Sequence, residues 1–302
     1  MKKIMGLWIL LTVFSSSSLA MAQSKTSPIS DEKAHEIVMT GTPDDVRKLL
    51  DSGYDVNKIY LCNTLLNSAI KSLVQTQAGL LHPEDVVEKI KILVNSGADV
   101  NLIACPKNSM SALHWAVSIP QQFRYLEVNA NEQIDEKIKN NIGKCDVPEI
   151  GSKPCGKVTP EERKKISLSI KTSIQLACDA FSPYFMEIID FLVTNGADIN
   201  LRTSSEGMAP LHIAVMKAQG ATLAPLQYLI KKGANLDVQD NDGNTPLFWA
   251  YGQRNDKATD MLLKSGADEE ITNKYGVIYK NVKGKNIMES VDKQGNTTLK
   301  EF

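Results

Sequence analysis

The sequence has 302 residues, of which 42% are hydrophobic and 23% charged, and its formal net charge at pH 7 is -1. These proportions are those of a soluble globular protein of one or two domains. A near-neutral balance leaves no overall basic surface, so we expect no nucleic-acid partner.

Residues 1–22 have the pattern of a Sec-type signal peptide. Lys2 and Lys3 precede an apolar run over 4–14, and a small-residue cleavage pattern ends at Ala22. This run is shorter than the roughly 20 residues that a membrane-spanning helix needs. We therefore expect cleavage after Ala22, a periplasmic or secreted mature chain, and no membrane insertion after cleavage.

Five short phrases built around a glycine recur along the chain. In order they are SGYDVN, SGADVN, NGADIN, KGANLD and SGADEE, with their glycines at Gly53, Gly97, Gly196, Gly233 and Gly266. Four of them follow a helix-opening pattern: NTLLNSAI, SALHWAV, APLHIAV and NTPLFWA. Each unit is therefore expected to be a helix, a turn, a second helix and a loop, with the glycine ending the second helix. The first unit, 30–57, lacks the opener and is expected to be an N-terminal cap.

The motifs PLHIA at 210–214 and TPL at 245–247, with a spacing of 33 positions from Gly233 to Gly266, resemble the ankyrin repeat family. The resemblance implies an all-α fold over 23–275: an ankyrin-repeat solenoid of about five helix-turn-helix repeats with β-hairpin-like loops. The second unit departs from the family pattern at its Pro and His positions, and the last unit has Phe248 in place of His.

One large helical insertion is expected inside the third repeat, at about 120–182. The helix opener at Ser111 and the next phrase glycine, Gly196, lie much further apart than in the other repeats. Within the insertion, NEQIDEKIKNNIG predicts a helix that ends at Gly143, and a second helix begins at a capping box of Thr159 and Glu162. We expect this insertion to pack against the repeats, and 276–302 to form a polar C-terminal cap or tail.

The five cysteines are interpreted in the light of export, because oxidising compartments favour pairing. Cys145 and Cys155 flank a polar turn-rich stretch and are expected to form a local disulfide. Cys62 and Cys105 occupy similar places in successive units and are candidates for a second disulfide, while Cys178 is expected to be a buried free thiol. The cysteine and histidine spacings match no zinc motif, so no metal site is expected.

The sequence contains no recognisable catalytic constellation. It has no nucleophile elbow, no phosphate-binding glycine loop and no HExxH motif. His114 and His212 fall where the ankyrin family has a structural histidine, and His35 and His82 stand isolated in the sequence. We therefore expect no enzyme activity, no catalytic residue and no cofactor.

The resemblance implies that another protein binds to the concave face and the loop tips. Trp115, Ile213 and Trp249 share one position of the repeat, with Ser68 in the second unit, and form either a binding stripe or part of the core. A second candidate patch is apolar loop residues, which either bind a partner or lie beneath the insertion: Ile59, Tyr60, Leu61, Ile103 and Met110.

These features together predict a non-catalytic, monomeric protein-binding module of the periplasm. By resemblance to other exported ankyrin proteins, its role is that of an immunity protein that neutralises a secreted toxin effector. The alternative is a helper that matures or protects a periplasmic enzyme such as a catalase. A less favoured interpretation is an enzyme with its site in the insertion.

Overall fold

The computed structural model describes residues 29–75, 82–105, 110–140, 143–147, 151–217, 223–278, 287–291 and 297–301. The expected signal peptide lies outside these ranges, and Cys178 lies within them but its side chain is not among those described. Among the helices described, none is long and apolar enough to cross a membrane.

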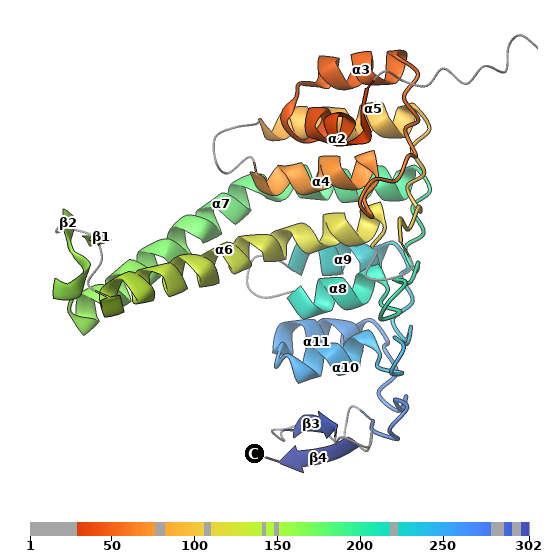
Figure 1. Cartoon of the computed structure of the whole chain (residues 1–302). Coiled ribbons are helices and arrows are strands. Elements are labelled where there is room, and N and C mark those ends of the chain that lie inside the picture. Colours follow the sequence, from red (N-terminus) through yellow and green to blue (C-terminus); the bar gives the residue numbers. More distant parts are fainter. Residues whose placement is uncertain are drawn as a thin grey trace, which may run out of the picture.

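Five helical hairpins stack side by side in the order of the sequence, with their connecting loops gathered along one edge (Figure 1). This arrangement confirms the expected all-α solenoid. The first helices of the pairs are α2 (Asp31–Thr40), α4 (Leu65–Gln75), α6 (Ala112–Asn140), α8 (Pro210–Lys217) and α10 (Pro246–Gly252). Their partners are α3 (Pro43–Asp51), α5 (Pro83–Asn95), α7 (Pro160–Thr194), α9 (Ala224–Lys231) and α11 (Asp256–Lys264).

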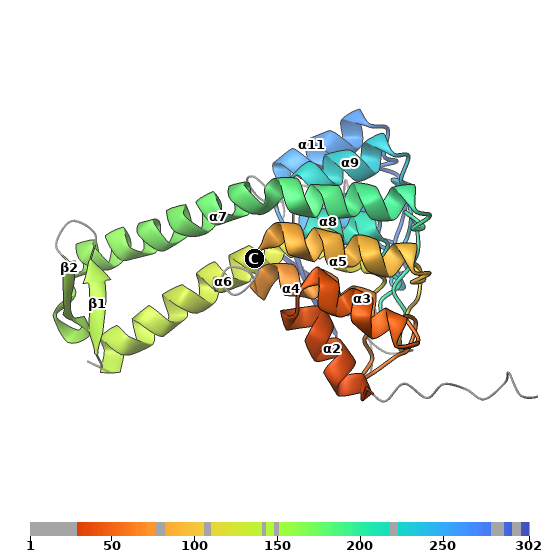
Figure 2. The ribbon, with the colours of Figure 1, turned by 90° about the horizontal axis from the view of Figure 1, so that it is seen from above.

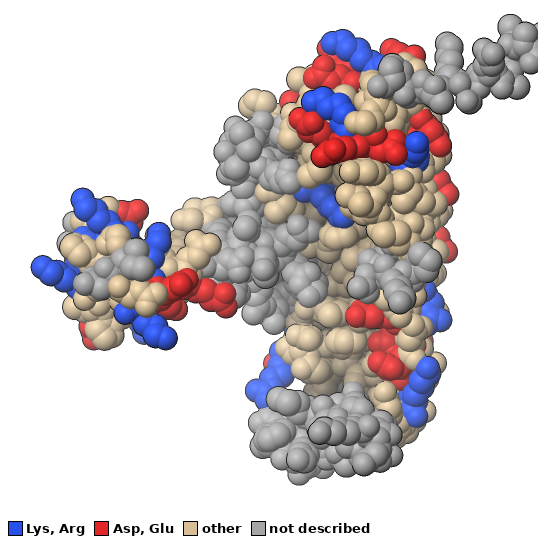
Figure 3. Space-filling model, viewed as in Figure 1, with Lys and Arg blue, Asp and Glu red and all other residues tan. Residues whose placement is uncertain are grey.

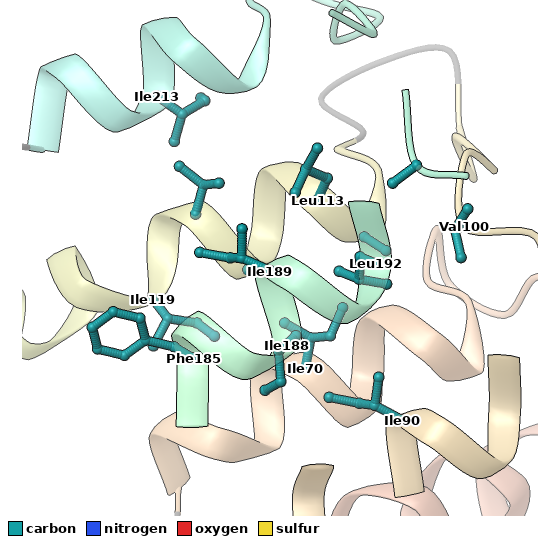
Figure 4. Packing of buried hydrophobic residues seen from close by; sticks show 14 of the residues in the cluster. Ile70, Ile90, Val100, Leu113, Ile119, Phe185, Ile188, Ile189, Leu192 and Ile213 are labelled. Carbon is teal, nitrogen blue, oxygen red and sulfur yellow. The ribbon is translucent and has the colours of Figure 1, made fainter. Parts of the chain in front are cut away.

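A single hydrophobic core runs through all five hairpins. Leu113, Phe185 and Leu192 are completely buried, and neighbouring hairpins bring Ile70 and Ile90 into contact with the same cluster (Figure 4). No helix pair could bury this much apolar surface alone, so each hairpin is stabilised by its neighbours. The core therefore fixes the spacing of the loops along the exposed edge.

The recurring glycine phrase has two structural roles. Gly97 follows α5 with a φ of +92°, a left-handed conformation that ends the helix cheaply only for glycine. The Asn that ends the first phrase then contacts the next phrase: the side-chain amide of Asn57 donates to the Gly97 carbonyl (3.0 Å) and its oxygen accepts from the Asp99 backbone N–H (2.7 Å). Asn101 makes the same pair of bonds with Gly196 and Asp198. The phrase thus holds successive loops in register.

The insertion differs from the sequence prediction in its packing. The two helices of the third repeat continue past the neighbouring helices and project from the side opposite the loops as a long antiparallel arm (Figures 1 and 2). We call 121–178 the arm, and 29–120 with 179–278 the array. The sequence prediction of an excursion that packs against the array is therefore wrong. Among the described side chains, Ile134 and Ile138 of α6 and Ile166 and Ile170 of α7 pack in one cluster at the arm's own end.

The free end of the arm has a small core of its own. Strands β1 (Lys144–Val147) and β2 (Gly151–Pro154) form an antiparallel hairpin that leads into a 3-10 turn, η2 (Cys155–Lys157). Cys145 and Cys155 form the expected disulfide, and both are buried with Val147 and Ile166. Thr159 caps α7 through the expected capping box, since its hydroxyl accepts from the Glu162 N–H and the Glu162 carboxylate accepts from the Thr159 N–H.

The C-terminal segment begins as a sixth loop. The Lys274 N–H donates to the Asp242 carbonyl (2.9 Å), and the Asn273 side chain donates to Asn244 (2.9 Å). Beyond it, strands β3 (Ile287–Val291) and β4 (Thr297–Glu301) pair as an antiparallel hairpin in the stretch for which we expected a polar cap or tail.

Candidate functional site

The loop between the first and second hairpins presents apolar residues on a constrained turn. Tyr60 and Asn63 bond to each other through both backbone N–H groups (3.0 and 2.9 Å), which closes a two-residue turn over Leu61 and Cys62. Leu61 has a φ of +45° and Cys62 a φ of +61°, a region that residues other than glycine, Asn and Asp seldom occupy. We call 59–63 the finger. The left-handed conformation of Leu61 and Cys62 costs roughly 1–2 kcal/mol for each of these two residues.

A disulfide fixes this finger to the next loop. Cys62 pairs with Cys105, as the sequence suggested, with a Cα–Cα distance of 5.3 Å. The cross-link holds the turn in place while Leu61 stays 77% exposed and Ile59 42% exposed. The arm leaves the array on the other side, so it does not cover the finger (Figure 2). The finger is therefore exposed and does not lie beneath the insertion.

The other loop candidates are less exposed. Tyr60 is half-buried, with its ring centroid 5.4 Å from that of His35. Ile103 is half-buried, and Met110 packs against the core while its carbonyl accepts from the side chain of Asn67 (3.2 Å). The exposed part of the patch is therefore the finger itself, centred on Leu61.

The proposed stripe along the first helices is divided between core and surface. Ile213 is 8% exposed and lies in the core, so it offers nothing to a partner in this structure, and Ser68 is also buried. Trp115 and Trp249 are both half-buried against the core. The indole N–H of Trp249 donates to Asp240 (2.7 Å), which holds that ring in place.

Lys71 is a surface residue that the sequence analysis did not single out. Its ammonium group lies 3.9 Å from the centroid of the Trp115 ring and donates to the side-chain oxygen of Asn63. Burial lowers the pKa of Lys71, and no ion pair with a carboxylate is seen within the described ranges. In the sequence, the one signal for the contact of Lys71 with Trp115 is that Lys71 lies about one helical turn after Ser68 in α4. Lys71 thus contacts both Asn63 of the finger and Trp115.

Two Ser–His pairs occur in the array, and both are enclosed. His35, isolated in the sequence, lies 2.8 Å from the Ser68 hydroxyl, and His114 lies 2.7 Å from that of Ser111. These serines are 4% and 1% exposed, so neither hydroxyl faces a space that a substrate could enter. Among the described residues, no group of His, Cys, Asp and Glu has the arrangement of a metal site.

His114 and His212 connect neighbouring repeats. Each accepts a backbone N–H at Nδ1, from Ser111 and Ala209, and lies at hydrogen-bond distance through Nε2 from a carbonyl of the next unit, Met208 (3.0 Å) and Asn244 (3.1 Å). Burial lowers the pKa of His114 to about 4 and also lowers the pKa of His212. Both imidazoles are thus neutral structural links, as expected from the sequence.

Comparison with known proteins agrees with this geometry. A family model described as ankyrin repeats, in three copies, matches residues 174–273. The human transient receptor potential cation channel subfamily A member 1 is 36% identical over 92 residues, which are 30% of this chain and 8% of that protein. A putative ankyrin repeat protein of Acanthamoeba polyphaga mimivirus is 32% identical over 97 residues, covering 32% of this chain and 21% of the viral protein. Human Rabankyrin-5 is 33% identical over 91 residues, covering 29% and 7%. The chain thus spans a small part of the relatives it matches.

Proposed function

Since the chain is built of ankyrin repeats, we propose that it is a non-catalytic protein-binding module of the periplasm that neutralises one protein toxin, as an immunity protein does. Ankyrin repeats suggest a protein partner, because a stacked array offers an extended surface and repeats of this kind carry no chemistry of their own. The identity of the partner and the compartment are the parts of this proposal that need experiment.

The observation that carries the proposal is the finger. A leucine that is 77% exposed, on a left-handed turn tied by a disulfide, is unfavourable for the isolated chain. Such a side chain is favourable when it enters an apolar pocket of a partner, and a pre-ordered turn loses little entropy on binding. Trp115 and Lys71 extend the same surface beside it. We propose that this surface is where the partner binds.

The two disulfides support the proposed compartment. Structural disulfides persist in oxidising environments and are rare where thiols are kept reduced. A cross-link between Cys62 and Cys105 and another between Cys145 and Cys155 suit an exported chain. The signal-peptide pattern of 1–22 supports the same destination.

The test is affinity capture with a matched pair of variants. The mature chain from Gln23, the finger variant Leu61→Ser and the control Leu176→Ser are each used to retain proteins from periplasmic extract and from candidate toxin preparations. Leu176 is 63% exposed on the arm, so the control removes comparable apolar surface elsewhere. We expect one dominant protein with the wild type and the control, and its loss with the finger variant. A protein retained equally by all three would contradict the role of the finger.

Activity of the retained protein separates the two roles. An immunity protein lowers the toxic activity of its partner when the two are mixed in equal amounts. A helper of a periplasmic enzyme raises the yield or lifetime of active enzyme instead. An activity of the chain alone, abolished by replacing acidic residues of the arm, would replace both with the enzyme interpretation.

A further inference from the structure

The charges of the molecule are segregated between the array and the free end of the arm. The array contains 24 Asp or Glu and 16 Lys or Arg, a formal net charge of -8. The stretch 137–171, which we call the arm end, contains nine Lys or Arg and four Asp or Glu, a formal net charge of +5. On the face drawn in Figure 3, blue side chains lie on several sides of the arm end, with red side chains among them. The overall charge of -1 hides this separation.

Most of the positive charge of the arm end faces solvent. Among the described residues, Lys153 bonds to the carboxylate of Glu162 (2.5 Å) and Arg163 bonds to that of Asp135. Six other lysines are exposed: Lys137, Lys139, Lys144, Lys157, Lys164 and Lys171. The arm end thus exposes several lysine ammonium groups to solvent.

One exposed apolar residue lies among these lysines. Leu168 is 64% exposed on α7. Lys164 precedes it by four residues and Lys171 follows it by three, so all three share one face of the helix. A large apolar side chain between lysines is typical of helices that rest on a membrane surface, with the leucine in the headgroup region and the ammonium groups beside lipid phosphates.

The chemistry of the arm end distinguishes among anionic partners. Protein interfaces are depleted in lysine and enriched in Arg, Tyr and Trp, whereas the arginine of the arm end, Arg163, is occupied by Asp135 and Asn131. Within the described part of 137–171, no aromatic residue is present for base stacking. A surface of diffuse negative charge that also accepts a leucine is an anionic lipid bilayer.

The length of the arm makes such a contact compatible with the acidic array. Residues 121–140 of α6 extend about 30 Å at the rise of an α-helix. Screening at physiological ionic strength acts over about 8 Å, so the negative charge of the array is largely screened at the arm end. The arm end would be attracted to an anionic surface while the array is held away from it, with the finger open to a protein partner.

We propose that the arm end is a docking site for the surface of an anionic phospholipid bilayer, engaged by its exposed lysines and Leu168. The contact is peripheral and does not cross the membrane. It is independent of the finger and of the proposed toxin partner, because it requires lipid alone. A lysine close to an anionic bilayer strengthens binding about fivefold, so three or four contacts give a measurable affinity.

The test is co-sedimentation of the mature chain with vesicles in 0.1 M salt. One set contains 30% phosphatidylglycerol in phosphatidylcholine, and the other contains phosphatidylcholine alone. We expect binding to the first set, little to the second, and loss in 0.5 M salt, because screening shortens at high ionic strength. Failure to bind the anionic vesicles would overturn the proposal whatever the outcome of the protein-capture experiment.

Two matched variants locate the contact. Replacing Lys144, Lys157, Lys164 and Lys171 with Gln should weaken binding at least about 25-fold if two of them touch lipid. The control replaces four exposed lysines of the array with Gln and changes the net charge equally: Lys231, Lys257, Lys264 and Lys274. Equal losses in both variants would mean attraction without a site and would overturn the proposal.

Leu168→Ser gives a further measurement at unchanged charge. We expect severalfold weaker binding to anionic vesicles and an unchanged helical circular dichroism spectrum, because the side chain is exposed. Unchanged binding of this variant would reduce the site to electrostatic attraction and overturn the part of the proposal that rests on Leu168. If the chain sediments to the same extent without vesicles because it self-associates, the whole proposal of lipid binding would be overturned.

Discussion

The helices α6 and α7 extend through two regions of the molecule, the array and the arm, in which they are stabilised by different contacts. Near the array they bury Ile119, Phe185 and Ile189 completely among neighbouring hairpins. In the arm they contact chiefly each other and are fastened at the far end by a disulfide and a core that includes Val147 and Ile166. The same two helices are thus stabilised by neighbours at one end and by a covalent clasp at the other. The comparison teaches that a repeat can be lengthened on one side without disturbing its stacking.

The largest expected effect is a core truncation at the base of α7. Phe185→Ala should lower the free energy of unfolding by about 3–5 kcal/mol, because a fully buried ring is replaced by a cavity. Leu168→Ala on the arm should change it by about 0.5 kcal/mol or less. Urea unfolding followed by helical circular dichroism measures both. A loss of several kcal/mol in the Leu168→Ala variant would contradict the exposed position of this side chain.

The next effect is confined to the arm. Replacing Cys145 and Cys155 with Ser removes a clasp that contributes up to about 3 kcal/mol by restricting the unfolded loop. We expect faster hydrogen exchange at β1, β2 and the adjoining ends of α6 and α7. Exchange in α8 to α11 should be unchanged, because repeats depend on their neighbours. Faster exchange throughout the array would contradict the separation of the two regions.

A pH effect should appear in the array and not in the arm. The pKa of His114 is about 4 in the folded protein and about 6.5 when unfolded. Above pH 6.5 both states are neutral and the stability is complete. As the pH falls toward 4, the unfolded chain takes up a proton that the folded protein excludes, so stability decreases. Between pH 7.5 and 5, His114 alone should contribute a loss of about 2 kcal/mol.

The variant His114→Gln tests this assignment. It should be less stable at pH 7.5, because the link to Met208 is altered, yet lose less stability than the wild type between pH 7.5 and 5. Urea unfolding at the two pH values gives the comparison. A loss as large as that of the wild type would assign the pH dependence to other groups, such as His212.

The smallest effect concerns the start of α7. Thr159→Ala removes an N-cap hydroxyl and should cost about 1 kcal/mol locally. Hydrogen exchange of the first turn of α7 reports it, and Thr172→Ala, whose exposed hydroxyl bonds to the Leu168 carbonyl within the same helix, is the control. Equal increases in hydrogen exchange in Thr159→Ala and Thr172→Ala would mean that the Thr159 N-cap does not stabilise the start of α7.

The repeats were predictable because their signals are local. The phrase glycines, the Thr159 capping box and the bridging histidines each follow from a few neighbouring residues. The sequence predicted a helical insertion at the position of the arm. It did not predict that this insertion projects away from the array. Pro120 and Pro183 lie inside α6 and α7, where sequence reasoning expects a helix to end, so the continuity of repeat and arm was hidden.

The candidate surface was predictable in part. Leu61 and Ile59 stand out as apolar residues in a loop, and the structure places both at the surface. The burial of Ile213 depends on packing against the next hairpin, and the contact of Lys71 with Trp115 joins two separate hairpins. Neither is encoded in a local pattern. A count of charged residues over 137–171 identifies the basic arm end from the sequence, whereas the net charge of the whole chain does not.

The central claim is that a partner protein is bound at the finger. The most direct measurement is hydrogen exchange by mass spectrometry on the mature chain, with and without the retained partner. The account predicts slower exchange over 57–63 and 101–105, next to the Cys62–Cys105 disulfide. Protection confined to the loops at 204–207 and 240–243, with none at the finger, would contradict it.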